Sequence, residues 1–96
     1  EKKFNKNNLI IAYEPIWSIG TGKIPTAQDL QKTTIYIKKV LKGLFKKNSP
    51  AVLYGGSVDG STVEMFKQIK EIDGFLIGGA SKSSKKFIDI IKNYYR

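Results

Sequence analysis

The stretch LIIAYEPIWSIGTGK, residues 9–23, sets a pattern that the rest of the sequence repeats. It begins with five apolar or aromatic residues in a row, and such continuous runs are typical of strands covered on both faces. A carboxylate, Glu14, ends the run, and a loop with two glycines follows. Two further runs, AVLY (51–54) and GFLIGG (74–79), also lead into glycine. We therefore predict three short buried strands, each followed by a glycine-rich loop.

Helical patterns follow each of these strands. The first has apolar residues at spacings of four and three, begins at a Thr26–Asp29 cap and ends at NSP (48–50). The apolar stripes of the three predicted helices are, in order, Leu30, Thr34, Ile37, Leu41 and Leu44; Val63, Phe66 and Ile69; and Phe87, Ile88, Ile91, Tyr94 and Tyr95. The order βαβαβα predicts an α/β fold with a parallel sheet and right-handed crossovers.

Composition bounds the kind of protein. The chain has 96 residues, which is enough for one small domain or a piece of a larger one. Its hydrophobic content of 41% and charged content of 26% are values of a globular protein. It has no cysteine, which excludes disulfides and zinc–thiolate sites, and no apolar run long enough to cross a bilayer.

The formal net charge of +9 suggests by itself a nucleic-acid or anionic partner. Arg96 is the only arginine, however, and lysine is poorly suited to bidentate reading of base edges. The lysines are also spread over the polar sides of the predicted helices. We therefore favour solvated helix faces. A lysine-rich nucleic-acid binder remains an alternative, which a DNA affinity that falls steeply with salt would support.

Each predicted strand carries a distinctive loop at its carboxyl end. Glu14 and PIWSIGTGK (15–23) follow the first strand, YGGS (54–57) the second and GGAS (78–81) the third. Glycine lets backbone N–H groups approach a ligand closely, and several such groups around a helix start bind phosphate. Each loop alone is more often a tight turn. Together, at the same end of successive parallel strands, they predict a phosphate-binding site.

Three segments in this order, AYEPIWSIGTGK (12–23), VLYGGSV (52–58) and GFLIGGAS (74–81), resemble the last three βα units of the triosephosphate isomerase family. The match is dense in the loops and loose in the helices. The resemblance implies that residues 1–96 are the C-terminal portion of a (β/α)8 barrel, an incomplete domain with the equivalents of barrel strands six to eight. Residues 1–8 would then be the end of the preceding helix and its loop.

The resemblance implies that Glu14 is the catalytic base. In that family the base takes a proton from the carbon next to the carbonyl of dihydroxyacetone phosphate. It then returns a proton to the neighbouring carbon, which gives glyceraldehyde 3-phosphate in glycolysis and gluconeogenesis. One carboxylate can act as base and then as acid when water is excluded from it.

The resemblance also implies that nine residues form a lid over the substrate, namely Pro15, Ile16, Trp17, Ser18, Ile19, Gly20, Thr21, Gly22 and Lys23. Pro15 would stiffen the entry hinge, Trp17 would anchor the lid in an apolar pocket, and the last three residues would form the exit hinge. Ser18 occupies a position usually filled by a small residue, so no function is assigned to it.

Backbone N–H groups would bind the substrate phosphate, again by resemblance, at Gly20, Ser57, Gly78 and Gly79. Tyr54 and Ser57 would also latch the closed lid. We expect no cofactor and no metal. The expected partners are a phosphorylated triose and the missing N-terminal part of the barrel, with no nucleic acid and no membrane. The family is homodimeric, and a glycolytic role suggests the cytoplasm.

Part of the family's machinery is missing from this sequence. The family also uses an asparagine and a lysine after the first barrel strand and a histidine after the fourth. This chain has no histidine, and none of its lysines follows such a strand. Three parallel strands cannot close a barrel, so two edges and an apolar inner face would stay open. We therefore expect the isolated chain to be inactive, and marginally stable, oligomeric or dependent on the rest of the barrel.

A second function fits some of these observations. A non-catalytic phosphate-binding module or remnant would use the three glycine loops without chemistry. The lack of histidine favours it. Glu14 and the lid argue against it, because plain phosphate binding has no use for either.

Overall fold

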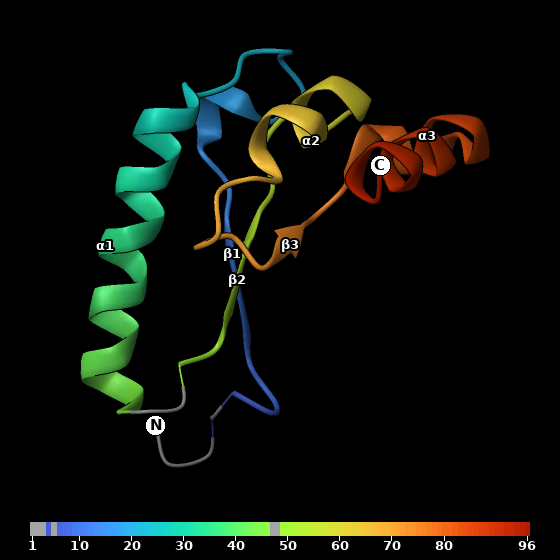
Figure 1. The fold of residues 1–96 in the computed structure, drawn as a ribbon. Helices are drawn as coiled ribbons and strands as arrows, with labels where there is room; N and C mark the ends of the chain where they lie inside the picture. Colours follow the sequence, from blue (N-terminus) through green and yellow to red (C-terminus); the bar gives the residue numbers. More distant parts are fainter. Residues whose placement is uncertain (1–3, 5, 47–48) are drawn as a thin grey trace.

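Strands and helices alternate along the chain as predicted. The structure, a computed structural model, describes residue 4 and residues 6–46 and 49–96. The elements are β1 (Ile10–Tyr13), the 3₁₀ helix η1 (Ile16–Ser18), α1 (Ala27–Phe45), β2 (Ala51–Tyr54), α2 (Gly60–Phe66), β3 (Gly74–Phe75), the 3₁₀ helix η2 (Gly79–Lys82) and α3 (Ser84–Tyr94). Figure 1 shows the strands at the centre, with α1 to their left, α2 above them and α3 to their right.

The three strands form one parallel sheet in the order β1-β2-β3, which confirms the predicted topology. Ile10 pairs with Ala51 and Tyr13 pairs with Tyr54, so β1 and β2 end level with each other. Tyr54 in turn pairs with Phe75 of β3. The loops that follow all three strands therefore leave the sheet at the same end.

β3 is shorter than the strand predicted over residues 74–79. The N–H of Leu76 still donates to the carbonyl of Tyr54 at 2.9 Å, but β2 ends at Tyr54. Beyond that point the register gives β3 no further partner, and the chain leaves the strand conformation at Gly78 (φ −93°, ψ −103°). The prediction was wrong for the last four residues because an apolar run does not show where the neighbouring strand ends.

The core lies between one face of the sheet and the helices. Tyr54 is at its centre and packs edge-on against the rings of Phe66 and Phe75, with centroid distances of 5.3 and 6.5 Å. Fully burying a large apolar side chain contributes about 1.5–3 kcal/mol. The buried cluster comprises Leu30, Tyr54, Val58, Val63, Phe66, Ile69, Ile72 and Ile90.

The opposite face of the sheet is open. Ile10 and Ala12 of β1 are exposed, whereas Ile11 and Tyr13, which point to the helices, are partly buried. Ile10 is 63% exposed, an unusual state for an isoleucine inside a strand. The expected open inner face is therefore present in this part of the chain.

α1 follows its predicted stripe except at the end. Thr26 caps the helix by accepting a hydrogen bond from the N–H of Asp29 at 3.1 Å, as predicted. Leu30, Thr34 and Leu41 are buried, but Leu44 is 70% exposed. The 19 residues of α1 span about 28 Å at 1.5 Å per residue, whereas a four-residue strand spans about 13 Å. The last turn therefore extends beyond the sheet. The helix ends at Phe45, and Asn48 of the predicted stop lies outside the described residues.

α2 ends earlier than its predicted stripe. Val63 and Phe66 are buried within it, and Ile69 is buried in the turn that follows the helix. Asp59 caps α2 in a capping box with Thr62. At its other end the Lys67 ammonium donates to the carbonyl oxygens of Asn93 and Arg96, at 2.9 and 3.2 Å. Lys67 therefore joins α2 to the end of α3.

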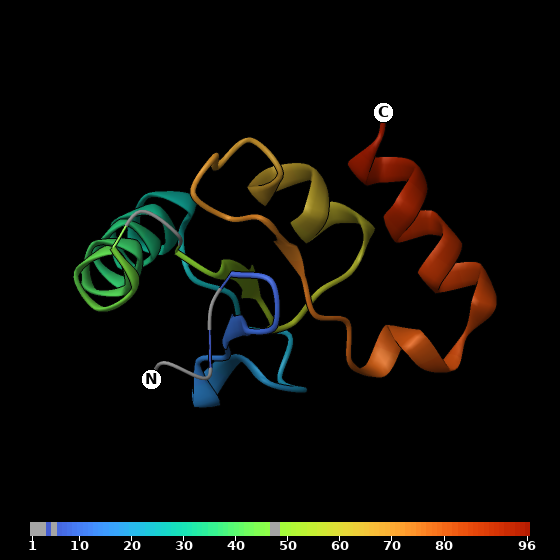
Figure 2. The same cartoon turned by 90° about the horizontal axis from the view of Figure 1, so that it is seen from below.

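α3 buries a different side from the one predicted. Ile90 is its buried residue, and the predicted stripe is largely exposed, with exposed fractions from 36% at Phe87 to 79% at Tyr95, although the Tyr94 ring packs edge-on against Phe75. Tyr95 also lies beyond the end of the helix. Figure 2 shows α3 beside α2 at one end of the molecule and α1 at the other. The stripe prediction was wrong about the buried face because α3 contacts α2 with its Ile90 side.

A carboxylate fixes the amino end of the sheet. Asp73, just before β3, accepts a hydrogen bond from the N–H of Val52 at 2.9 Å and forms an ion pair with Lys38 of α1 at 2.9 Å. Its own N–H donates to the carbonyl of Val52 at 2.8 Å. Asp73 thus joins α1, β2 and the start of β3.

The prediction for residues 1–8, a helix end followed by a loop, can be compared with the structure only in part. Lys6, Asn7 and Asn8 form a turn, as expected for a loop before β1. The helix end predicted within residues 1–8 falls mainly on residues 1–3 and 5, which lie outside the described residues. Within the described part of the chain, no helix is both long and apolar enough to span a membrane.

Candidate functional site

The carboxyl end of the sheet holds a cavity of about 480 Å³. Glu14 follows β1, Gly55 to Asp59 follow β2, and Leu76 to Ala80 follow β3, and all of them line it together with three lid residues. In Figure 1, β1 and β2 run upward and the lid loop lies above their ends. The predicted residues that line this one cavity are Glu14, Gly20, Ser57, Gly78 and Gly79.

Glu14 lies against the tip of β2, and its side chain is exposed on the cavity side. Its Cγ and one carboxylate oxygen would be 2.9 and 3.0 Å from a Cβ atom at Gly55. Such distances are shorter than real Cβ contacts allow, so a glycine is required where Glu14 crosses β2. Gly55 is a site residue that the sequence analysis missed. Its signal was the paired glycine in YGGS, which was interpreted as a tight turn or as part of a phosphate-binding loop.

The lid is a compact turn. Thr21 Oγ1 donates to the carbonyl of Trp17 at 2.8 Å and accepts from the N–H of Lys23 at 3.0 Å. Gly20 (φ +68°) and Gly22 (φ +80°) have left-handed backbone conformations, which residues with a side chain rarely adopt. The sequence therefore needs its two glycines to fold the lid in this way.

Lid residues differ strongly in burial. Pro15 and Ser18 are buried, whereas Ile16 is 88%, Trp17 51% and Ile19 51% exposed. Trp17 is half-exposed in this conformation and does not line the cavity. The structure therefore does not place it in the apolar pocket expected for an anchor.

The lid is hydrogen-bonded to the loop after β2. The N–H of Gly22 donates to Ser57 Oγ at 3.0 Å, and Ser57 Oγ donates to the carbonyl of Ser18 at 2.5 Å. The hydroxyls of Tyr54 and Ser18 are 3.1 Å apart. Both residues expected to latch the lid, Tyr54 and Ser57, thus contact it.

Ser18 was predicted to belong to the lid, but the sequence analysis assigned it no individual role. It is fully buried, and its hydroxyl also donates to the carbonyl of Lys23 and accepts from the N–H of Ser57. Gly56 makes room for this arrangement, because a Cβ atom there would overlap the hydroxyls of Tyr54 and Ser18. The only sequence signal is a hydroxyl residue between Trp17 and Ile19.

The loop after β3 leads into the short helix η2 beside the cavity. Gly78 and Gly79 stand at the start of η2, as the expected short helix start requires. No heavy atom of the described residues lies within 4 Å of a Cβ position at either glycine. The space beside the two glycines is therefore free for a ligand.

The charges near the cavity are few. Among the described residues, Glu14 and Asp59 are the acidic ones that line it, and no basic side chain does. Backbone hydrogen bonding from Thr62 lowers the pKa of Asp59 against an opposing effect of burial, and the Ser61 hydroxyl also lowers it. Asp59 is thus engaged in capping α2. Within the described residues there is no group of three His, Cys, Asp or Glu side chains that could hold a metal ion.

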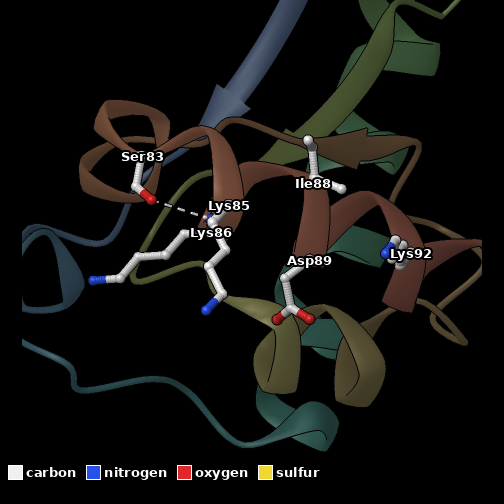
Figure 3. Close-up of a pocket in the computed structure, with 6 residues that line it drawn as sticks. All are labelled: Ser83, Lys85, Lys86, Ile88, Asp89 and Lys92. Atoms are coloured by element: carbon white, nitrogen blue, oxygen red, sulfur yellow. Dashed lines mark hydrogen bonds between the residues drawn. The ribbon is translucent and has the colours of Figure 1, made fainter.

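A second hollow of about 530 Å³ lies along α3 (Figure 3). Its polar features are the N-cap of the helix, where Ser83 Oγ accepts from the N–H of Lys86 at 3.2 Å, and exposed lysine side chains. Lys85, Lys86 and Lys92 are exposed on this helix, as predicted for a solvated face. No strand-end loop contributes to the hollow, so we assign the functional site to the cavity that contains Glu14.

A parallel βαβαβα segment whose glycine-rich loops gather at the carboxyl ends of its strands belongs to the class of parallel α/β proteins, whose ligand sites lie at that end of the sheet. Comparison with known proteins agrees. The triosephosphate isomerase family model matches residues 1–94. Among curated relatives, the triosephosphate isomerase of Chlamydia abortus is 42% identical over 92 residues, which is 93% of this chain and 36% of that protein. That of Dictyostelium discoideum is 42% identical over 92 residues, which is 91% of this chain and 35% of that protein.

A solved structure gives the same result. The crystal structure of triosephosphate isomerase from Bartonella henselae superimposes with a TM-score of 0.85 and 30% sequence identity, over 100% of this chain and 38% of that one. The chain therefore belongs to the triosephosphate isomerase family and has the fold of part of its barrel. It spans about a third of the length of the curated relatives it matches.

Proposed function

We propose that this chain supplies the base, the lid and the phosphate-binding loops of a triosephosphate isomerase. The observation that supports this most directly is that Glu14 and the three glycine-rich loops line one cavity. A triose phosphate bound there would place its phosphate at Gly78 and Gly79 and its carbon chain beside Glu14. Gly20 and Ser57 would complete the phosphate site through their N–H groups.

In this proposal Glu14 performs both proton transfers. Its carboxylate removes a proton from the hydroxymethyl carbon of dihydroxyacetone phosphate, and the C–H electron pair forms the double bond of an enediolate. The carboxylic acid then returns a proton to the former carbonyl carbon. The hydroxyl proton on the first carbon's oxygen passes to the former carbonyl oxygen, which leaves the aldehyde of glyceraldehyde 3-phosphate. The lid limits access of water to the intermediate, whose phosphate would otherwise be eliminated.

The chain does not complete this site alone. An enediolate needs donors at its oxygens, and removing one such donor costs about 10²–10³ in kcat. The sequence has no histidine, and no basic side chain of the described residues lines the cavity. We therefore propose that activity requires the five preceding βα units, in a homodimeric cytoplasmic enzyme, and that the isolated chain is inactive.

Complementation tests the assignment of the base. The chain is mixed with a polypeptide that carries the missing five βα units of the Chlamydia abortus relative, and isomerase activity is measured. We expect the mixture to be active and the chain alone to be inactive. Glu14→Gln should reduce kcat at least a thousandfold because the glutamine amide cannot accept the proton, and Glu14→Asp should reduce it less.

The matched control is Glu64→Gln, on the exposed surface of α2, which should leave kcat within twofold of the parent. An assembled Glu14→Gln variant that is as fast as the parent would show that another group is the base. If the mixture binds inorganic phosphate but never isomerises, the non-catalytic phosphate-binding alternative is correct. The lack of histidine is the observation that keeps this alternative open.

A further inference from the structure

The hydroxyl of Ser18 joins the lid to the rest of the site. The side chain is fully buried within a loop whose neighbouring residues, Trp17 and Ile19, are half-exposed. Ser18 Oγ donates to the carbonyl of Lys23 at 2.5 Å, accepts from the N–H of Ser57 at 3.1 Å and lies 3.1 Å from the hydroxyl of Tyr54. Burial of a polar group without solvent is tolerated when its partners are present, as they are here.

The direction of the hydrogen bond to Tyr54 follows from counting. A serine hydroxyl has one hydrogen and two acceptor sites. The hydrogen is directed to the carbonyl of Lys23, and one acceptor site holds the N–H of Ser57. Tyr54 must therefore be the donor to Ser18, which fills the second acceptor site. Burial raises the pKa of the Tyr54 phenol, in keeping with a neutral hydroxyl.

These bonds hold both ends of the lid at one place. Ser18 ends η1 at the start of the lid, and Lys23 is the last residue of the lid. The Ser57 hydroxyl adds a second connection, since it donates to the carbonyl of Ser18 and accepts from the N–H of Gly22. Between these fixed points Gly20 lines the cavity with Glu14.

We propose that Ser18 is a positioning residue of the isomerase. Its hydroxyl holds the lid against the loop after β2, and it thereby sets the fraction of molecules in which Gly20 covers the cavity. This role rests on the proposed function of the site. Ser18 acts through the lid and does not touch the substrate. Its position was assigned no role by sequence because its partners belong to a different βα unit.

Removal of the Ser18 hydroxyl should destabilise the closed lid relative to the lifted lid. In Ser18→Ala, the Tyr54 O–H, the Ser57 N–H and the Lys23 carbonyl lose a partner while the lid is down. When the lid lifts, these groups reach water and regain hydrogen bonds. Buried polar groups left without partners are costly. The equilibrium therefore shifts toward the lifted lid.

The test uses the chain, labelled with ¹⁵N, assembled with the polypeptide that carries the missing five units, so that only this chain is observed. Ser18→Ala should raise the hydrogen-exchange rates of the Gly22 and Ser57 amides about tenfold and lower kcat/KM by a similar factor, as expected for a loss of about 1.4 kcal/mol. Binding of glycerol 2-phosphate, a non-reacting phosphoester, should weaken in parallel. Ser84→Ala, an exposed serine on α3, should change none of these quantities.

Tyr54→Phe is a second, independent test, because it removes the hydroxyl that donates to Ser18 and keeps the aromatic ring in the core. It should raise exchange at Ser57 about threefold, and adding Ser18→Ala to it should cost less than Ser18→Ala costs in the parent. Should Ser18→Ala prevent assembly, Tyr54→Phe decides alone.

Unchanged exchange at Gly22 and Ser57 in either variant would overturn the role of Ser18, whatever the activity. An assembly that never isomerises, yet shows faster exchange in Ser18→Ala, would overturn the proposed function and retain the lid contact. The two failures are thus distinguishable.

Discussion

At the scale of residues, the two adjacent glycines after β2 serve different neighbours. Gly55 leaves room for the Glu14 side chain, and Gly56 leaves room for the hydroxyl pair of Tyr54 and Ser18. Neither glycine has a left-handed φ, so backbone freedom is not what they supply. They are needed because the side chains of Glu14, Ser18 and Tyr54 occupy the space where their Cβ atoms would be.

Gly55→Ala should therefore misplace the base. The new methyl group would lie 2.9 Å from Glu14 Cγ and 3.1 Å from Leu76 Cβ, and Glu14 must move to relieve the contact. A displacement of about 1 Å in a reacting group can cost about 10²-fold in rate. Steady-state kinetics of the complemented enzyme should show a loss of about that size in kcat.

The control is Gly43→Ala on the exposed side of α1, where no neighbouring atom lies within 4 Å of the Cβ position. It should leave kcat unchanged and stabilise the helix by about 0.5–1 kcal/mol, because alanine loses less backbone entropy than glycine. Equal kcat values for the two variants would show that Gly55 does not position Glu14.

Sequence reasoning located the strand-end residues but not Ser18. Glu14, Ser57 and Gly78 could be placed together because parallel strands bring their carboxyl ends to one edge. The partners of Ser18, Tyr54 and Ser57, are 36 and 39 residues away from it. A hydrogen bond between side chains so distant in sequence depends on the register of two strands and the path of the lid, which no local pattern encodes.

At the scale of elements, α2 depends on its cap. Its seven residues are too few for a helix that is stable by itself. Asp59 accepts a hydrogen bond from the N–H of Thr62 at 2.9 Å, and Thr62 Oγ1 accepts in return from the N–H of Asp59 at 2.8 Å. This reciprocal pair fixes the loop that follows Ser57 as well as the helix.

The cap predicts a pH dependence of stability. The pKa of Asp59 is lowered in the folded state, chiefly by the Thr62 N–H, so the folded chain binds this proton less readily than the unfolded chain. The stabilisation is fully present above the unfolded-state pKa, about 3.9, and is lost as the pH falls through the lower folded-state value. The melting temperature of the assembled protein, measured by thermal unfolding as a function of pH, should therefore fall less at acidic pH for Asp59→Asn than for the parent.

Asp29→Asn is the control for this measurement, because the N-cap of α1 is Thr26 and not Asp29. Its acid dependence should match that of the parent. Asp59→Ala should in addition cost about 1 kcal/mol at neutral pH, the usual effect of removing an N-cap. A parent and an Asp59→Asn variant with identical curves below pH 4 would contradict the role of the cap.

Helix periodicity found the helices but not always their buried faces. The α1 stripe is right up to Leu41, because α1 packs on the sheet through most of its length. In α3 the periodicity marks a strongly apolar side, yet Ile90 is buried and Ile91 is 43% exposed. Periodicity shows which side of a helix is apolar. It does not show whether the element that covers that side is part of the chain.

At the scale of the whole molecule, apolar surface is exposed on the sides where further barrel units would lie. Large apolar patches on an isolated protein mark interaction surfaces. The open sheet face carries Ile10, and the exposed side of α3 carries Phe87, Ile88 and Ile91. Because the chain spans about a third of its relatives, these surfaces are expected to contact the preceding units.

Assembly should therefore cover hydrophobic surface. The chain alone should bind the dye ANS, and addition of the polypeptide with the missing units should reduce the dye fluorescence and raise the melting temperature. Ile10→Lys should prevent both changes, because it places a charge on the inner face of the sheet. Met65→Lys, at a residue of α2 that is 49% exposed, should assemble normally. Normal assembly of Ile10→Lys would show that this face stays open.

The contacts of Asp73 with α1 and β2 have a consequence for protein engineering. It connects Lys38 and Val52 at the amino end of β2, whereas the lid and the glycine-rich turns sit beyond the carboxyl end. The hydrogen bonds and the ion pair of Asp73 thus involve none of the residues that would contact a substrate. Replacement of the loop between Pro15 and Lys23 by a loop from another protein should therefore leave the pairing of the strands unchanged. The substrate specificity of this segment could then be altered without disturbing its sheet.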